Sequence, residues 1–129
     1  MRRALLISFS LACLHHGSIA QFADEPRYGQ GCGIAGVDPD QRYAIETLIH
    51  YKDTAGIFGW LHDKEPVLQA YALEALIRLQ LDGLSVPESE SHRMDTLRRS
   101  KRLVHVCSGC SHWEMPLAEA VKMFVGKQE

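Results

Sequence analysis

The segment Pro66–Leu81 constrains the fold of this 129-residue chain more than any other part of the sequence. When its residues are placed at about 100° each, as in an α-helix, the polar ones fall into two strips. One strip holds Gln69 and Gln80, and the other holds Glu74 and Arg78. Apolar residues fill both faces between the strips. A helix with two apolar faces is packed from both sides, so we expect this helix at the centre of a small domain.

Capping signals predict further helices around this central one. The pairs Ser85 and Glu88, and Ser111 and Glu114, have the Ser-x-x-Glu spacing of a capping box. Asp53 is a suitable N-cap for a short helix. Residues 103–106 fit either a helix end or a short extended piece. The expected helices are 38–51, 54–61, 66–81, 86–102 and 111–126.

These helices predict an all-α fold, a small bundle of four or five helices in a single domain over residues 38–126. Residues 21–37 contain several glycines and show no hydrophobic periodicity. We therefore expect an irregular, Gly-rich lead-in before the helical domain.

Residues 53–81 combine a short helix, a tight turn and a longer helix whose Ala72 and Ala75 are small enough for close helix packing. In this arrangement the segment resembles a HEAT-type helical hairpin, which would then form the centre of the bundle. HEAT-like families mostly act as binding scaffolds. The resemblance therefore implies an interaction function rather than catalysis.

The first twenty residues have the composition of a secretory signal peptide. A basic start at Arg2 and Arg3 precedes an apolar run of about ten residues, which is too short to span a bilayer. Small residues at Ser18 and Ala20 fit cleavage before Gln21. We therefore expect an exported protein, periplasmic or extracellular, without a membrane span. A buried N-terminal helix and a lipoprotein modified at Cys13 are the alternatives.

Three cysteines remain after this cleavage: Cys32, Cys107 and Cys110. Exported proteins meet an oxidising environment, which favours disulfides. A bridge from Cys32 to either of the other two would pin the lead-in onto the C-terminal half of the chain. The sequence does not decide between the two partners.

Cys107 and Cys110 also form a Cys-x-x-Cys motif flanked by His105 and His112. This is half of a structural zinc signature, which usually has two separated pairs of ligands. A redox role needs a thiol at a helix N-terminus, and Cys110 precedes the expected helix start at Ser111. However, no βαβ pattern surrounds the motif. A c-type haem requires histidine directly after the second cysteine, so His112 comes one residue too late.

Charge and motifs exclude several function classes. The formal net charge of −2 gives no basic footprint for nucleic acid. The one basic run, residues 98–102, is typical of the solvated face of an outer helix. No complete catalytic constellation is present, and we predict no catalytic, cofactor-binding or metal-binding residues.

Two hypotheses follow from these observations. The first is a non-catalytic protein-binding or structural module of the cell envelope, whose partner is another protein. The second is a thiol-dependent redox or metal-binding protein that uses Cys107 and Cys110.

Overall fold

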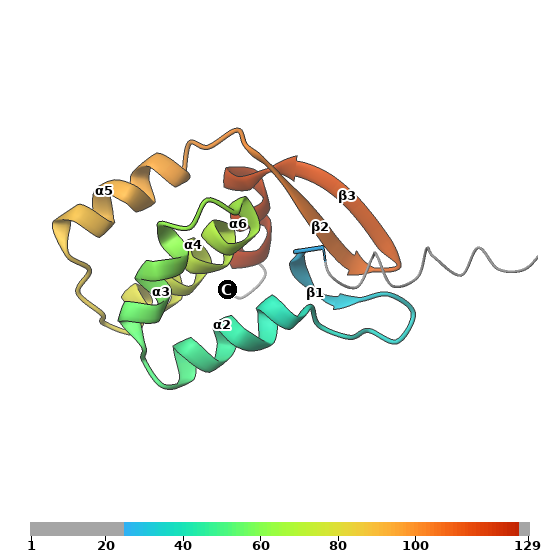
Figure 1. Ribbon diagram of the computed structural model, residues 1–129, viewed down its shortest axis with the longest axis horizontal. Coiled ribbons are helices and arrows are strands. Elements are labelled where there is room, and N and C mark those ends of the chain that lie inside the picture. The colour runs from blue at the N-terminus through green and yellow to red at the C-terminus, as the bar shows by residue number, and fades with distance from the viewer. Residues whose placement is uncertain (1–24, 127–129) are drawn as a thin grey trace, which may run out of the picture.

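The computed structural model describes residues 25–126, which form five helices and a three-stranded sheet (Figure 1). The predicted signal peptide and its cleavage site lie outside the described residues. No helix within residues 25–126 is long and apolar enough to cross a membrane. The elements are β1 (Tyr28–Cys32), α2 (Asp40–His50), α3 (Thr54–Leu61), α4 (Pro66–Leu81), α5 (Glu88–Leu97), β2 (Leu103–Gly109), β3 (Ser111–Pro116) and α6 (Leu117–Val125).

The all-α prediction is wrong, because the helices pack beside a mixed sheet with the strand order β1-β2-β3. Strand β1 runs parallel to β2, and β3 runs antiparallel to β2. β1 lies within the segment expected to be irregular. β3 occupies the start of the expected helix 111–126, so that α6 begins only at Leu117.

Two local patterns explain these corrections. Ser111 and Glu114 do not form a capping box, because residues 112–115 alternate between the two faces of a strand. The helix expected over residues 86–102 begins at Glu88 without a side-chain cap and ends at Leu97. Residues 103–106, which fitted either a helix end or an extended piece, form the first part of strand β2.

One face of the sheet packs against α4 and α6, which separate it from α3 and α5, whereas α2 contacts β1 directly (Figure 1). Tyr28, Val104 and Val106 point into this contact and are buried. Trp113 and Met115 on β3 share the same face and are half-buried. The opposite face of the sheet carries the disulfide and several polar side chains.

The prediction of a central helix over residues 66–81 is confirmed with the same bounds. The side chain of Glu65 caps its first turn by accepting a hydrogen bond from the amide of Val67 at 3.2 Å. Even Gln69 and Glu74, which belong to the two polar strips, are only 1% exposed. The helix is therefore enclosed on the strips as well as on its apolar faces over its first turns, whereas Gln80 and Leu81 at its C-terminal end are exposed.

A buried ion pair joins α4 to α2 and β1. The carboxylate of Glu74 accepts hydrogen bonds from both terminal nitrogens of Arg42, at 2.8 and 3.0 Å. It also accepts one from the hydroxyl of Tyr28 at 2.6 Å. Burial, and then the neighbouring charge of Glu74, raise the pKa of Tyr28 well above its usual range, so this hydroxyl keeps its proton.

A partly exposed carboxylate extends this network. Glu46 receives two hydrogen bonds from Arg78, at 2.6 and 3.0 Å, and a longer one from Arg42 at 3.2 Å. Partial burial raises the pKa of Glu46, but the hydrogen bonds and charges of Arg78 and Arg42 together outweigh it. The pKa of Glu46 is therefore lowered, and the group stays ionised at neutral pH.

Side chains of the helices cover the outer edge of β1. The hydroxyl of Tyr71 donates to the carbonyl of Arg27 at 2.7 Å and accepts from the amide of Gly29 at 3.1 Å. The Nε of Arg42 donates to the carbonyl of Gly29 at 3.0 Å. A Cβ atom at position 29 would overlap the carbonyl oxygen of Cys107, so only glycine allows this close approach to β2.

Candidate functional site

The structure brings the three candidate cysteines to one end of the sheet. Cys32 closes β1, Cys107 lies in β2, and Cys110 lies in the turn between β2 and β3. Cys32 and Cys107 form a disulfide, with their Cα atoms 5.5 Å apart. The predicted disulfide is confirmed, and its partner, which the sequence left open, is Cys107. Cys110 is an exposed free thiol.

A tight turn follows directly after the disulfide-bonded Cys32. The backbones of Cys32 and Val37 exchange two hydrogen bonds, at 2.9 and 3.0 Å. Within this bridge the amide of Gly36 donates to the carbonyl of Gly33 at 3.1 Å. Gly33 and Gly36 have φ values of 74° and 62°, which side-chain-bearing residues rarely adopt. The glycines that made this segment look irregular therefore build a defined turn.

The hairpin turn between β2 and β3 lies beside this first turn. Gly109 has a φ of 57° and precedes Cys110, which is typical of a two-residue type II′ hairpin turn. The amide of Gly33 donates to the carbonyl of Gly109 at 2.6 Å and so joins the two turns. Both project toward the same side of the molecule (Figure 1). We call residues 32–37 and 108–111 together the two-turn tip.

The two-turn tip exposes apolar side chains. Ile34 is 98% exposed and Val37 is 56% exposed, whereas a large aliphatic residue is usually buried. Ile34 lies between the two hydrogen-bonded glycines of the turn, so its backbone is fixed although its side chain contacts little of the protein. The tip therefore presents an apolar group on a preformed support.

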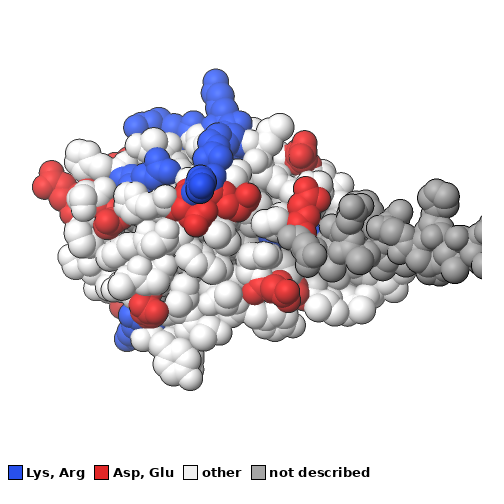
Figure 2. Space-filling model, in the orientation of Figure 1, with Lys and Arg blue, Asp and Glu red and all other residues white. Residues whose placement is uncertain are grey.

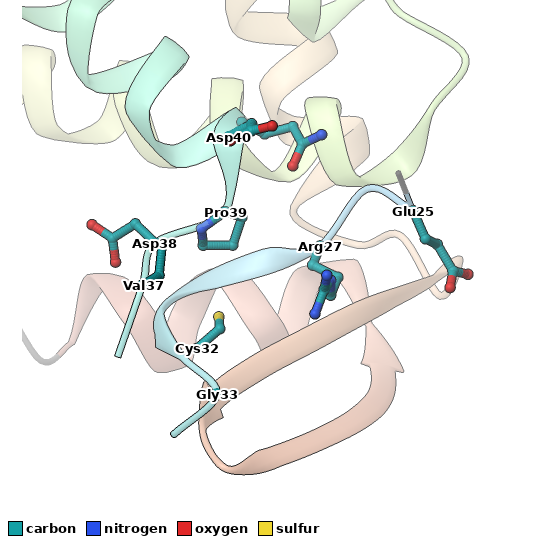
Figure 3. Close-up of a pocket in the computed structure, with 9 residues that line it drawn as sticks. Glu25, Arg27, Cys32, Gly33, Val37, Asp38, Pro39 and Asp40 are labelled. Atoms are coloured by element: carbon teal, nitrogen blue, oxygen red, sulfur yellow. The ribbon is translucent and has the colours of Figure 1, made fainter. Parts of the chain in front are cut away.

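A cavity of about 290 Å³ lies between the two-turn tip and the start of α2. Figure 3 shows Asp38 at one end of it and Glu25 at the other, with Cys32 and Arg27 between them. One oxygen of Asp38 accepts a hydrogen bond from the amide of Gly31 at 2.6 Å. This bond ties the helix-leading segment to β1. The remaining lining residues are Gly33, Val37, Pro39, Asp40 and Gln41.

The two histidines of the cysteine motif lie on the outer face of the sheet. His105 and His112 line a second cavity of about 290 Å³, together with Glu25 and Arg27. The Nδ1 of His105 is 3.8 Å from a carboxylate oxygen of Glu114. Within residues 25–126, no three His, Cys, Asp or Glu side chains lie close enough together to hold a metal ion.

The structure does not join Cys107 and Cys110 as a reactive pair. Cys107 is fully buried and bonded to Cys32, and Cys110 precedes a strand instead of a helix. A redox thiol is usually activated by a helix N-terminus, and none lies next to Cys110. The arrangement weighs against the thiol-dependent hypothesis.

The basic run 98–102 lies away from the two-turn tip. Figure 2 shows Lys and Arg side chains gathered along one edge, above the segment that joins α5 to β2. Arg102 donates to Gln69 at 3.3 Å and to the carbonyl of Lys64 at 2.8 Å, so it holds the turn between α3 and α4. Arg98 lies 4.0 Å from Asp95.

Sequence reasoning missed Ile34, the most exposed large apolar residue of the described chain. The available signal was an Ile-Ala pair enclosed by Gly33 and Gly36, next to a cysteine expected to form a disulfide. Such a pair fits the central positions of a β-turn. The same signal would have assigned the glycines to a turn.

Comparisons with known proteins leave the class of this protein open. No protein-family model, no curated protein and no solved structure matches this chain.

Proposed function

We propose that this protein is an exported, disulfide-stabilised and non-catalytic binding module that contacts another protein through the two-turn tip. The observation that carries the proposal is Ile34, 98% exposed on a turn fixed by a disulfide and by backbone hydrogen bonds. Exposing this side chain gives the monomer no stabilisation. A partner that buries it would gain about 1.5–3 kcal/mol for a fully buried aliphatic side chain.

The rigidity of the turn supports the same proposal. A loop that is already ordered loses little conformational entropy when it binds, so more of the contact energy remains as affinity. Three restraints order this loop: the Cys32–Cys107 bond, the Cys32–Val37 bridge and the hydrogen bond from Gly33 to Gly109. Each of them fixes the backbone and leaves the side chain of Ile34 free to insert into a partner.

The HEAT-like resemblance agrees with an interaction role, but it places that role on a different element. The α3–α4 hairpin would act as the scaffold, and the two-turn tip would supply the contact. A structural module of the cell envelope would use the same surfaces.

Photocrosslinking tests where the partner binds. We expect p-benzoylphenylalanine in place of Ile34 to give a discrete crosslinked product in the native host. The matched control replaces Tyr51, which is 75% exposed at the far end of α2 (Figure 1). The product should disappear when untagged protein competes and persist when an untagged Ile34→Asp variant is added instead. Equal crosslinking from both positions, or none from position 34, would contradict the proposal.

Export is tested separately by the mass of the protein recovered from its native host. The basic start, the apolar run and the small residues before Gln21 support export, and the disulfide is compatible with it. We expect a mature chain that begins at Gln21 and a non-reducing peptide map that joins Cys32 to Cys107. A retained leader with reduced cysteines would refute export without affecting the crosslinking result.

A further inference from the structure

Strand β3 forms an edge of the sheet that no other described element covers. It pairs with β2 on one side, and no strand within residues 25–126 pairs with its other side. Uncovered edges are templates for pairing with another chain, and proteins usually protect them with lysines, prolines or bulges. β3 has the sequence SHWEMP without a lysine, and its pairing with β2 has no register shift. Only Pro116, at its end, blocks the edge.

The register of the hairpin shows which backbone groups face outward. Opposite pairs alternate between hydrogen-bonded and non-bonded along an antiparallel ladder. A two-residue turn is closed by a bonded pair, here Ser108 and Ser111, so Trp113 and Met115 also bond to β2. The next odd-numbered position agrees with this alternation, since the amide of Leu117 donates to the carbonyl of Arg102 at 2.8 Å.

The residues between these bonded pairs, His112 and Glu114, therefore direct their backbone amides and carbonyls away from β2. Strand β1 forms the opposite edge of the sheet, and side chains cover several of its outward backbone groups. There the amide of Gly29 donates to Tyr71, its carbonyl accepts from Arg42, and the amide of Gly31 donates to Asp38. Within the described chain, no side chain performs this task for His112 and Glu114.

We propose that two copies of this chain pair through β3, antiparallel and about a two-fold axis at Trp113. In this register His112 of one copy lies opposite Glu114 of the second copy. Each such pair exchanges two backbone hydrogen bonds, so that the two symmetric pairs give four. A closed two-fold pairing of this kind uses the same surface on both copies.

Side-chain chemistry favours this register over its neighbours. His112 and Glu114 project from the same face of the strand, so each pair places an imidazole next to a carboxylate. A register centred on Glu114 would instead place two carboxylates opposite each other. On the other face, the half-buried Trp113 lies opposite its symmetry mate, and the half-buried Met115 lies diagonal to that same Trp113 of the second copy, so both lose exposed apolar surface.

This pairing is independent of the two-turn tip. Because the strands are antiparallel, the two tips of the dimer lie at opposite ends of the joined sheet. A tip contact and an edge contact can therefore form at once, and either can fail without the other.

Sedimentation analysis of the mature protein tests the pairing, with Cys110→Ser in every sample to prevent intermolecular disulfides. We expect a reversible species of twice the monomer mass. Glu114→Pro removes the outward amide of residue 114 and leaves the hydrogen bonds between β3 and β2 intact. Proline is tolerated at such an outward position of an edge strand. It deletes two hydrogen bonds per dimer, so dimerisation should weaken by at least about tenfold. The control Glu114→Gln keeps the amide and should retain dimerisation.

Two further measurements cover the case in which the proline variant does not fold. Amide exchange at His112 and Glu114 should slow as the protein concentration rises, while exchange at other exposed amides stays unchanged. The variant His112→Glu should be monomeric, and the double variant His112→Glu/Glu114→Lys should pair again. A monomer at every concentration, or a dimer that is insensitive to all changes on β3, would overturn the proposal.

Discussion

Replacing Arg42 with methionine should destabilise the protein by about 3–5 kcal/mol, since breaking a buried ion pair leaves an uncompensated charge. Arg42 is 3% exposed and Glu74 is 1% exposed, so water cannot replace the lost partner. Arg78 approaches the Glu74 carboxylate only to 3.7 Å and is already bonded to Glu46. The free energy of unfolding from urea denaturation measures the effect.

A double-mutant cycle separates the ion pair from general packing. In Arg42→Met/Glu74→Leu both charges are gone and apolar groups of similar size fill the space. We expect this double variant to be more stable than Arg42→Met alone. The exposed Arg99→Met should change stability by less than about 0.5 kcal/mol. If Arg42→Met is no worse than Arg99→Met, the ion pair is not a structural element of the fold.

This ion pair also shows what the sequence could not reveal. Glu74 lies on a polar strip of α4, and such a strip usually faces solvent. Its partner Arg42 comes from a different helix, 32 residues earlier, so no local pattern links the two. Periodicity gives the direction in which a side chain points, but not what lies there.

The helices were predictable because their signals are local. Asp53 accepts a hydrogen bond from the amide of Gly56 at 3.0 Å, as its capping position suggested. The bounds of α4 follow from its apolar faces and from Pro66 at its first turn. In both helices the residues that decide the structure lie within one or two turns of each other.

The strands were missed because their signals are not local. β1 contains glycines, which have a low strand propensity, and it becomes a strand only because it pairs with β2. The disulfide that joins the two strands links Cys32 to Cys107, 75 residues further along the chain. In β3, the Ser111 and Glu114 spacing imitated a capping box. The alternation of Trp113 and Met115 with polar residues was the competing and correct signal. The candidate site depends on these strands, so its geometry was out of reach.

Removing the disulfide should destabilise the protein by about 4 kcal/mol on the chain-entropy model, because the bond closes a long loop in the unfolded chain. The sequence separation of Cys32 and Cys107 is 75 residues. The change to make is Cys32→Ala/Cys107→Ala, since alanine places no polar atom at the fully buried position 107. Urea denaturation of this variant and of the parent under oxidising conditions gives the difference.

The free cysteine supplies the matched control for this experiment. Cys110 is exposed and unbonded, so Cys110→Ala should leave the stability within about 0.5 kcal/mol of the parent. A similar, large loss from Cys110→Ala and from the double variant would mean that Cys110 is the partner of Cys32, since both variants would then remove the bridge. The two-turn tip adds a second consequence. Without the bond, the turn that carries Ile34 keeps its hydrogen bonds but loses its covalent tie to β2. The yield of crosslinking from position 34 should therefore fall in this variant even at temperatures where it remains folded. Such a fall would show that the disulfide contributes to binding at the tip as well as to the stability of the fold.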